Sequence, residues 1–270
     1  QAVGISQASY DEALAYAKDR KQFNQAIINF PGVYEMLSNM KARLDAGRAL
    51  LYQTARYVDI YKSLEDIERT RKLTDEEKAE LKLYNKLASA GTPLTKGMNA
   101  EYSNINSYDS IQVHGGSGYM LEYACQRLYR DARITSIYEG TTQLQVVAAL
   151  PHITTGTYTS MLDELEAAAV APEFESLKAR AKAMDDKFKA AIDYVKAAEN
   201  NEFLDLCSRR LYEMAGNCVM AQLLIRDASA NAELFGKSAK VYLNLAEAEV
   251  MKHSNFIMNL TAEQIADYKA

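Results

Sequence analysis

Apolar residues recur along most of the chain at the three-, four- and seven-residue steps of a single helix face. One such stripe begins after Pro31, a residue well suited to the first turn of a helix. Its members are Val33, Met36, Met40, Leu44 and Leu51. The stripe predicts a helix to about Tyr61. Strand-type alternation is nowhere convincing, and 4 prolines and 12 glycines interrupt the 270 residues. The pattern therefore predicts an all-α fold.

Polar signals divide the first half of the chain into further helices. The spacing predicts a helix over 6–20 and a charged, exposed connection over 63–78. The run Thr74-Asp75-Glu76-Glu77 resembles a capping box. It predicts the start of a third helix that runs towards Val113, with an interruption at Gly91-Thr92-Pro93, because proline breaks helical hydrogen bonding.

After the third predicted helix the chain contains a glycine cluster, two short helices and a linker. Gly115-Gly116-Ser117-Gly118 is its densest glycine cluster and predicts a turn. Short helices over 123–130 and 140–151 follow, with an irregular piece over 134–139. The segment 154–159, rich in Thr and Gly, reads as a linker. We therefore expect a helical bundle over 1–156 and a second helical bundle, an extension, over 157–270.

The extension contains three predicted helical segments, and the second has an apolar seam. Its residues alternate steps of four and three. They are Cys207, Leu211, Met214, Cys218, Ala221 and Ile225. Such a seam predicts packing against a neighbouring helix.

Charge argues against two classes of partner. Residues 1–156 carry 18 acidic and 18 basic side chains, whereas 157–270 carry 18 and 13, so the whole net charge of −5 lies in the extension. Nucleic acid and an anionic membrane surface both call for a basic face. The longest apolar runs are far short of the ~20 residues that span a bilayer. The sequence predicts no nucleic-acid partner and no membrane partner.

Cysteine and histidine usage points to no metal centre. The residues concerned are Cys125, Cys207, Cys218, His114, His152 and His253. No CxxC spacing occurs, and no histidine has a ligand partner at helical spacing, so we predict no metal site. Free thiols favour a reducing compartment, here the cytoplasm. The chain begins Gln1-Ala2-Val3 without an initiator Met, which suggests a fragment or a processed product.

Three short segments hold the residues best suited to chemistry. They are 19–23 (DRKQF), 112–119 (QVHGGSGY) and 130–143 (RDARITSIYEGTTQ). Singly, each has an ordinary structural explanation, such as a solvated helix end or a glycine turn. In this order and at these separations they resemble the C-terminal domain of the acyl-CoA dehydrogenase family, over residues 1 to about 153. Residues 157–270 resemble the extra helical extension of the larger bacterial members.

The resemblance implies FAD-dependent oxidation of an acyl-CoA between its α and β carbons. Glu139 matches the base that removes the α-proton, and its backbone N–H would polarise the thioester carbonyl. Gly140 would leave room for the thioester, and Tyr138 would line the acyl or CoA channel. Such a base must be desolvated so that its pKa approaches the working pH. The developing enolate oxygen needs preorganised donors, and the flavin accepts the hydride.

The resemblance also implies cofactor contacts in the first two segments. Arg20 matches an arginine that reaches the pyrophosphate of an FAD bound mainly by the neighbouring subunit, a suitable use of a planar fork donor. Phe23 would pack at the adenine of that FAD, and Gln22 would add a polar contact. Gln112 and Gly116 match positions along the adenine dinucleotide portion.

Two further contacts and two departures from the family pattern complete the comparison. Thr141 and Gln143 lie at a predicted helix N-terminus, where free N–H groups favour a phosphate of FAD. Asn24 stands where family members usually have Gly, and Pro31 stands where Gln or Ala is common. Both departures affect the loop that follows Phe23.

The family's N-terminal helical and middle β-domains are missing from this sequence, so we expect the chain alone to be inactive. For the full-length enzyme the resemblance implies an acyl-CoA substrate and an electron-transferring flavoprotein as acceptor. We expect a homodimer in which the extension folds back over the face that a second dimer would occupy. Two alternatives stay open: an acyl-CoA oxidase, which shares the base and FAD, and a non-catalytic helical module that mediates oligomerisation.

Overall fold

Helices make up nearly all of the computed structural model, which describes residues 1–269, and the all-α prediction is confirmed. The α-helices are α1 (Ala2–Asp19), α2 (Pro31–Glu68), α3 (Asp75–His114), α4 (Ala124–Thr135), α5 (Thr142–Thr154), α6 (Thr157–Ala167), α7 (Glu175–Ala197), α8 (Asn201–Ala230) and α9 (Ala232–Met258). Short 3₁₀ segments are η1 (Ile27–Asn29), η2 (Gly115–Tyr119), η3 (Pro172–Phe174) and η4 (Ala262–Tyr268). Two two-residue strands, β1 (Lys21–Gln22) and β2 (Gln25–Ala26), form an antiparallel hairpin.

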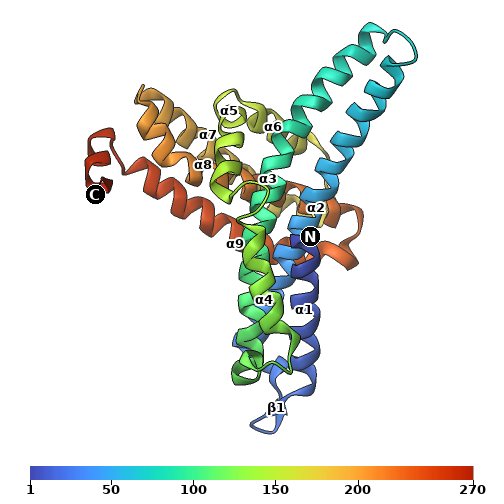
Figure 1. The fold of residues 1–270 in the computed structure, drawn as a ribbon, viewed down its shortest axis with the longest axis vertical. Coiled ribbons are helices and arrows are strands. Elements are labelled where there is room, and N and C mark those ends of the chain that lie inside the picture. Colours follow the sequence, from blue (N-terminus) through green and yellow to red (C-terminus); the bar gives the residue numbers. More distant parts are fainter. Residues whose placement is uncertain (270) are drawn as a thin grey trace.

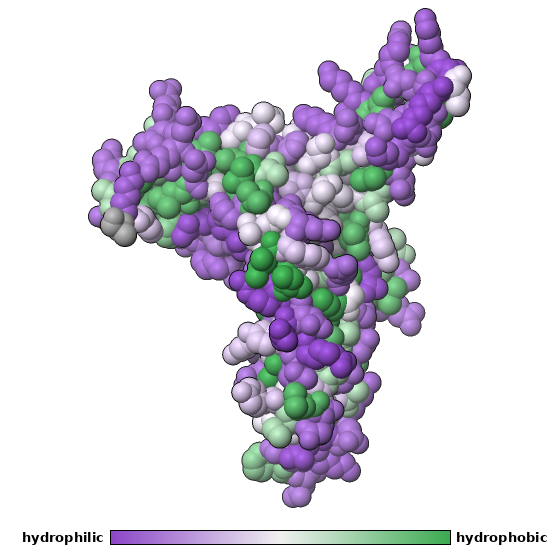
Figure 2. All heavy atoms as spheres, viewed as in Figure 1, coloured by the Kyte–Doolittle hydropathy of each residue, from purple (hydrophilic) through white to green (hydrophobic). Residues whose placement is uncertain are grey.

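The helices are arranged as three arms that meet near the middle of α3 (Figure 1). One arm combines α1, α4 and parts of α2 and α3, with the β-hairpin at its tip. The second arm is the α2–α3 hairpin, and the third holds much of the extension. Figure 2 shows hydrophilic side chains over most of one face, with apolar side chains gathered where the arms meet. Over residues 1–269, no helix combines the length and the apolar character needed to cross a membrane.

The α2–α3 hairpin confirms the predicted capping box but corrects the expected connection. Thr74 Oγ1 accepts from the Glu77 N–H at 3.2 Å, and the Glu77 carboxylate accepts from the Thr74 N–H at 2.9 Å. However, the charged segment 63–78 is largely helical, and the connection is confined to 69–74. Its charges form helix-supporting pairs at steps of three, such as Asp75–Lys78 at 2.8 Å.

The predicted interruption at Gly91-Thr92-Pro93 is wrong, because α3 runs continuously through Pro93. Proline lacks an N–H and disturbs the carbonyls of the preceding turn. Two tyrosines of the extension donate to carbonyls of this stretch, and one of these carbonyls lies in the turn before Pro93. Tyr158 Oη donates to the Ala90 carbonyl at 2.8 Å, and Tyr212 Oη donates to the Pro93 carbonyl at 2.9 Å. A distant part of the chain thus contacts the backbone of α3 where the helix passes through Pro93.

The main hydrophobic core joins α2 and α3 to the helices of the extension. Its centre is α8, whose predicted seam from Cys207 to Ile225 is buried at every position. Helices α3 and α8 approach closely. A Cβ on Gly97 would clash with the Tyr212 hydroxyl, and one on Gly216 would lie 2.7 Å from the Met98 sulfur. The extension thus folds back on the first half of the chain, and the core crosses residue 156. The division at that residue stays a prediction.

A smaller core holds the arm that carries the hairpin. Ala13 and Ala17 of α1 pack with Met40 of α2 and Val113 of α3. The cluster fixes the end of α1 beside the end of α3. The basic segment after α1 and the glycine cluster after α3, both singled out by sequence, are therefore brought side by side.

One carboxylate in the extension is buried without full compensation. Asp185 of α7 is 1% exposed, and Gln222 Nε2 of α8 donates to its Oδ2 at 2.9 Å. Its other oxygen, Oδ1, has no hydrogen-bond partner among the described residues. Burial raises the pKa of Asp185 to about 6, although Gln222, Cys218 and Lys189 favour the charged form. The ionised form is therefore costly in the fold.

We predict that Asp185→Asn stabilises the chain at neutral pH. Because the folded-state pKa lies above the ordinary ~3.9, the carboxyl contributes its full stability below about pH 4 and loses it as pH rises through 6. The substitution should raise the free energy of unfolding by about 1–3 kcal/mol at pH 7.5 and have little effect at pH 4. Chemical denaturation across this pH range measures it, with the exposed neighbour Asp186→Asn as control. Equal behaviour of the two variants at every pH would contradict the prediction.

Candidate active site and cofactor-binding surfaces

Glu139 lies in a tight loop between α4 and α5. The Thr142 N–H donates to the Ser136 carbonyl at 3.0 Å, which closes the loop around residues 137–141. Within it Glu139 has φ +51° and Gly140 has φ +90°. A left-handed backbone is uncommon for a residue other than glycine and costs of the order of 1–3 kcal/mol. The loop thus holds a glutamate in a conformation that must be imposed by its surroundings.

Two side chains of α3 hold the C-terminal side of this loop. Lys96 Nζ donates to the Gly140 carbonyl at 2.6 Å, and the Thr142 hydroxyl donates to Glu101 Oε1 at 2.6 Å. Burial lowers the pKa of Lys96, while the carboxylates of Glu101 and Glu139 act in the opposite direction. The ammonium group therefore sits in a partly desolvated place between two acids.

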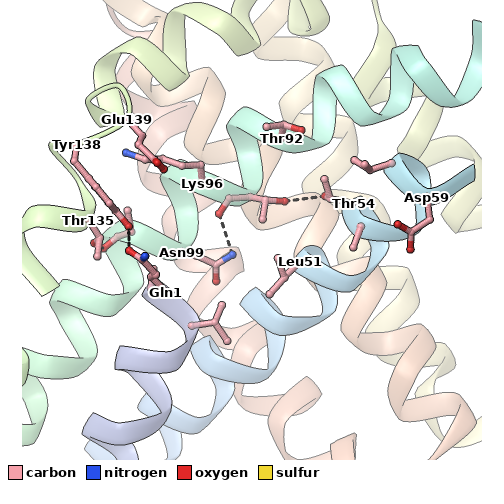
Figure 3. Close-up of a pocket in the computed structure, with 16 residues that line it drawn as sticks. Gln1, Leu51, Thr54, Asp59, Thr92, Lys96, Asn99, Thr135, Tyr138 and Glu139 are labelled. Carbon is pink, nitrogen blue, oxygen red and sulfur yellow. Dashed lines mark hydrogen bonds between the residues drawn. The ribbon is translucent and has the colours of Figure 1, made fainter. Parts of the chain in front are cut away.

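Tyr138 and Glu139 border a cavity of about 530 Å³. It lies between the start of α1 and the facing sides of α2 and α3 (Figure 3). In Figure 3 Glu139 and Lys96 lie at one end and Asp59 towards the other. The Tyr138 hydroxyl donates to Gln1 Oε1 across the rim. The Glu139 side chain is exposed, so the described residues do not supply the desolvation that sequence reasoning expected for a base.

A second hollow, of about 540 Å³, lies beside the β-hairpin. Arg20, Gln22, Phe23 and Gly116 line it, so the fold brings together four of the predicted FAD contacts. The two turn residues of the hairpin, Phe23 and Asn24, have φ +48° and +64°. A two-residue turn with both φ values positive matches the twist of a hairpin. It leaves the Phe23 ring 86% exposed beside the hollow.

The glycines of the cluster have different structural reasons. Gly115 has φ +60°, which favours glycine. A Cβ on Gly118 would lie 2.7 Å from the Ile111 carbonyl oxygen, so Gly118 is required for close packing. A Cβ on Gly116 would meet no atom within 4 Å. The backbone of Gly116 is therefore open to the hollow that it lines.

The remaining predicted contacts lie elsewhere. Thr141 and Gln143 line a third hollow of about 440 Å³, together with Arg133 and Glu101. The Thr141 side chain also caps α5, since its oxygen accepts from the Leu144 N–H at 3.3 Å. Gln112 is exposed in the last turn of α3 and lines neither of these hollows. The predicted residues thus fall into separate groups around the molecule.

Sequence reasoning missed Lys96 and Glu101. Neither belongs to a recognisable motif, and Lys96 precedes Gly140 by 44 residues. A helical pattern places both on α3 but gives no sign of what they contact. Only the packing of α4 and α5 on α3 brings them to the loop.

Family models match both halves of the chain. The model described as "Acyl-CoA dehydrogenase, C-terminal domain" matches residues 1–149. The model described as "Acyl-CoA dehydrogenase C terminal" matches residues 154–265. The chain belongs to the acyl-CoA dehydrogenase family. The resemblance carried by its three short segments is therefore confirmed.

Individual members of the acyl-CoA dehydrogenase family align mainly over the first half. A 3-(aryl)acrylate reductase from Clostridium sporogenes is 39% identical over 145 residues, which are 54% of this chain and 32% of that protein. A subunit of the caffeyl-CoA reductase–Etf complex from Acetobacterium woodii is 34% identical over the same shares. The chain thus spans about a third of the length of the curated relatives that it matches.

A solved structure is similar over nearly the whole chain. The acyl-CoA dehydrogenase from Bacillus anthracis, complexed with FAD, superposes with a TM-score of 0.72. The sequence identity is 22%, and the match covers 95% of this chain and 47% of that one. The extension is therefore part of a helical fold that a known structure shares.

Two substitutions can separate the close packing of Gly118 from the open surroundings of Gly116. Gly118→Ala should lower the free energy of unfolding by about 1–3 kcal/mol, because its methyl group meets backbone atoms that cannot move aside. Gly116→Ala should change it by no more than about 0.5 kcal/mol, because the space beside it is open. Thermal or urea unfolding of the chain compares them. Equal losses would show that Gly116 is also a packing residue.

Proposed function

We propose that this chain is the proton-abstracting part of an FAD-dependent acyl-CoA dehydrogenase, with Glu139 as the base. The observation that carries the proposal is the setting of Glu139. It is a non-glycine residue with φ +51° at the edge of a cavity, in a loop that other residues hold in place. Backbone strain of this kind clusters at active sites. The family membership of residues 1–149 supports the same assignment.

The reaction assigned to these residues is the removal of an α-proton from an acyl-CoA thioester. A carboxylate oxygen of Glu139 accepts the proton, and the Glu139 backbone N–H donates to the thioester carbonyl, where negative charge develops. Tyr138 lines the substrate channel. Gly140 leaves room for the thioester. Bound FAD supplies the acceptor for the hydride that leaves the β-carbon.

Desolvation of Glu139 is assigned to groups outside the described residues. The side chain is exposed here, whereas an effective carboxylate base needs a pKa near the working pH. The bound acyl chain and the rest of the full-length enzyme would cover it. This division agrees with a chain that spans about a third of its relatives.

The residues around the second hollow fit a dinucleotide cofactor. They combine a guanidinium, an exposed aromatic ring and an open glycine backbone. Arg20, Gln22, Phe23 and Gly116 are assigned to the FAD held mainly by a neighbouring subunit, with Gln112 next to them. Thr141 and Gln143, at the N-terminus of α5, are assigned to a phosphate of a second FAD, the one that belongs to this chain's own subunit. Two separate surfaces are what a cofactor shared between subunits requires.

The direction of the reaction depends on the electron partner. The two relatives described above are named as reductases, and one of these names includes Etf. Glu139 could return a proton to the α-carbon as readily as it removes one, so the same site suits either direction. We assign an electron-transferring flavoprotein as the partner in preference to oxygen, which an acyl-CoA oxidase would use. A purely structural module would not need a glutamate with a strained backbone at the edge of a cavity. This disfavours the alternative of a non-catalytic helical module.

The extension is assigned a structural role. We propose the division into a catalytic helical domain over 1–156 and an extension over 157–270 that covers α2, α3 and α5 of the same chain. That cover would leave a homodimer as the assembly. The three buried free thiols support a cytoplasmic, reducing location.

Glu139→Gln tests the catalytic assignment. In the full-length enzyme it should keep FAD bound and lower the rate of α,β-dehydrogenation by about 10²–10⁴-fold or more, because the amide cannot accept the proton. A dye-linked assay on an acyl-CoA panel measures the rate. Glu80→Gln, an exposed position in the first turns of α3, is the matched control. Turnover above a tenth of the wild-type value in Glu139→Gln would end the assignment.

Arg20→Ala tests the cofactor surface. The guanidinium forms no ion pair within residues 1–269, which leaves it available to a phosphate. Its loss should weaken FAD binding by roughly 10–100-fold, the worth of a charge-assisted hydrogen bond. Flavin absorbance per chain after gel filtration of the full-length protein measures retention. Lys18→Ala, which removes an exposed cation two residues earlier, should retain FAD fully, and equal retention by both variants would contradict the assignment.

A further inference from the structure

We infer that Lys96 is a positioning residue, which holds the loop around Glu139 in its left-handed conformation through a hydrogen bond to the Gly140 carbonyl. This inference rests on the proposed function for its catalytic consequence. Its structural part stands on contacts within the chain. Lys96 belongs to none of the three motif segments, and nothing in the sequence pattern assigns it a role.

The geometry is that of a strong, directed contact. Lys96 Nζ lies 2.6 Å from the Gly140 oxygen, a length typical of a charge-assisted hydrogen bond. The same ammonium lies 5.8 Å from the centre of the Tyr138 ring. Lys96 therefore touches the residues on both sides of Glu139. Helix α3, which carries it, packs extensively against α2 and α1.

The Lys96 contact restrains the Gly140 carbonyl, directly after Glu139. Glu139 and Gly140 both have positive φ, so the carbonyls on either side of their shared peptide are turned away from their usual directions. The Gly140 carbonyl has a second donor, Gln145 Nε2, but at 3.4 Å. Without Lys96, that weak bond would be the one side-chain contact left to the Gly140 carbonyl among the described residues, while the contacts of Thr142 with Ser136 and Glu101 would still close the loop. Relaxation of the loop would move the Glu139 carboxylate and its backbone N–H together.

The placement of charge favours a lysine at this position. Lys96 is half-buried, which opposes the charged form, but Glu101 and Glu139 both stabilise the ammonium. Glu101 is itself engaged by the Thr142 hydroxyl. Two side chains five residues apart on α3 thus hold Gly140 and Thr142, and Lys96 holds the one next to the base.

The inference predicts a defect in turnover rather than in binding. In the full-length FAD-loaded enzyme, Lys96→Met should lower kcat by about 10–100-fold, because small misplacement of a catalytic group has effects of this size. KM should change by less than about threefold, since the residues assigned to the acyl-CoA, Tyr138 and Gly140, are themselves unaltered. Lys96→Arg keeps a cationic donor and should restore kcat to within about fivefold of wild type. Lys82→Met, on an exposed turn of α3, should have no effect.

A second measurement does not depend on activity. Hydrogen exchange of the full-length protein should show faster exchange of the amides of residues 138–142 in Lys96→Met, with α3 itself unchanged. Unchanged loop exchange together with unchanged kcat would overturn the inference. Loss of kcat with unchanged loop exchange would also overturn it, because Lys96 would then act by another route. Faster loop exchange in a protein whose Glu139→Gln variant stays active would support the role of Lys96 in holding the loop and refute the proposed function.

Discussion

The close packing of α3 against α8 is the constraint on which the rest of the structure depends. Glycines at Gly97 and Gly216 let the two helices approach, and the Tyr212 hydroxyl fits into the space left by Gly97. That hydroxyl also donates to the Pro93 carbonyl at 2.9 Å, which ties α8 to the backbone of α3. The distance and rotation of α3 are thereby fixed, and with them every side chain that α3 presents.

Helix α3 positions the residues around the candidate site. Lys96 and Glu101 hold the loop of Glu139, and the glycine cluster at the end of α3 forms one wall of the hollow beside the hairpin. The extension also interacts with a residue that holds this loop, through an ion pair. Arg209 of α8 lies 3.7 Å from Glu101, which accepts a hydrogen bond from Thr142. A strained backbone persists only where its surroundings determine it, and here those surroundings include both halves of the chain.

Local features were predictable from the sequence, and long-range ones were not. The capping box of Thr74 and the seam of α8 depend on residues within a few positions of one another, and both were confirmed. The predicted interruption at Pro93 was wrong, and the side chain that donates to the turn before it, Tyr158, is 68 residues away from its acceptor, Ala90. Lys96 could not be found for the same reason.

For the site residues, too, the sequence and the structure supplied different information. Glu139 and the proposed FAD contacts were named through family resemblance, and their roles stay predictions. The structure adds a reason for one departure from the family pattern. Asn24 has φ +64°, a conformation that asparagine tolerates better than most residues, so it can stand where glycine is usual. That explanation could not be read from the sequence, since it depends on the conformation of the turn.

The most direct test of Glu139 as the base is α-proton exchange without oxidation. An acyl-CoA with sulfur in place of its β-carbon cannot lose a hydride, so deuterium uptake at its α-carbon reports proton removal alone. The full-length FAD-loaded enzyme in deuterated water should incorporate deuterium at this carbon, as followed by mass spectrometry, and Glu139→Gln should reduce the rate to that of the solution without enzyme. Equal deuterium uptake by the wild type and Glu139→Gln would contradict the account.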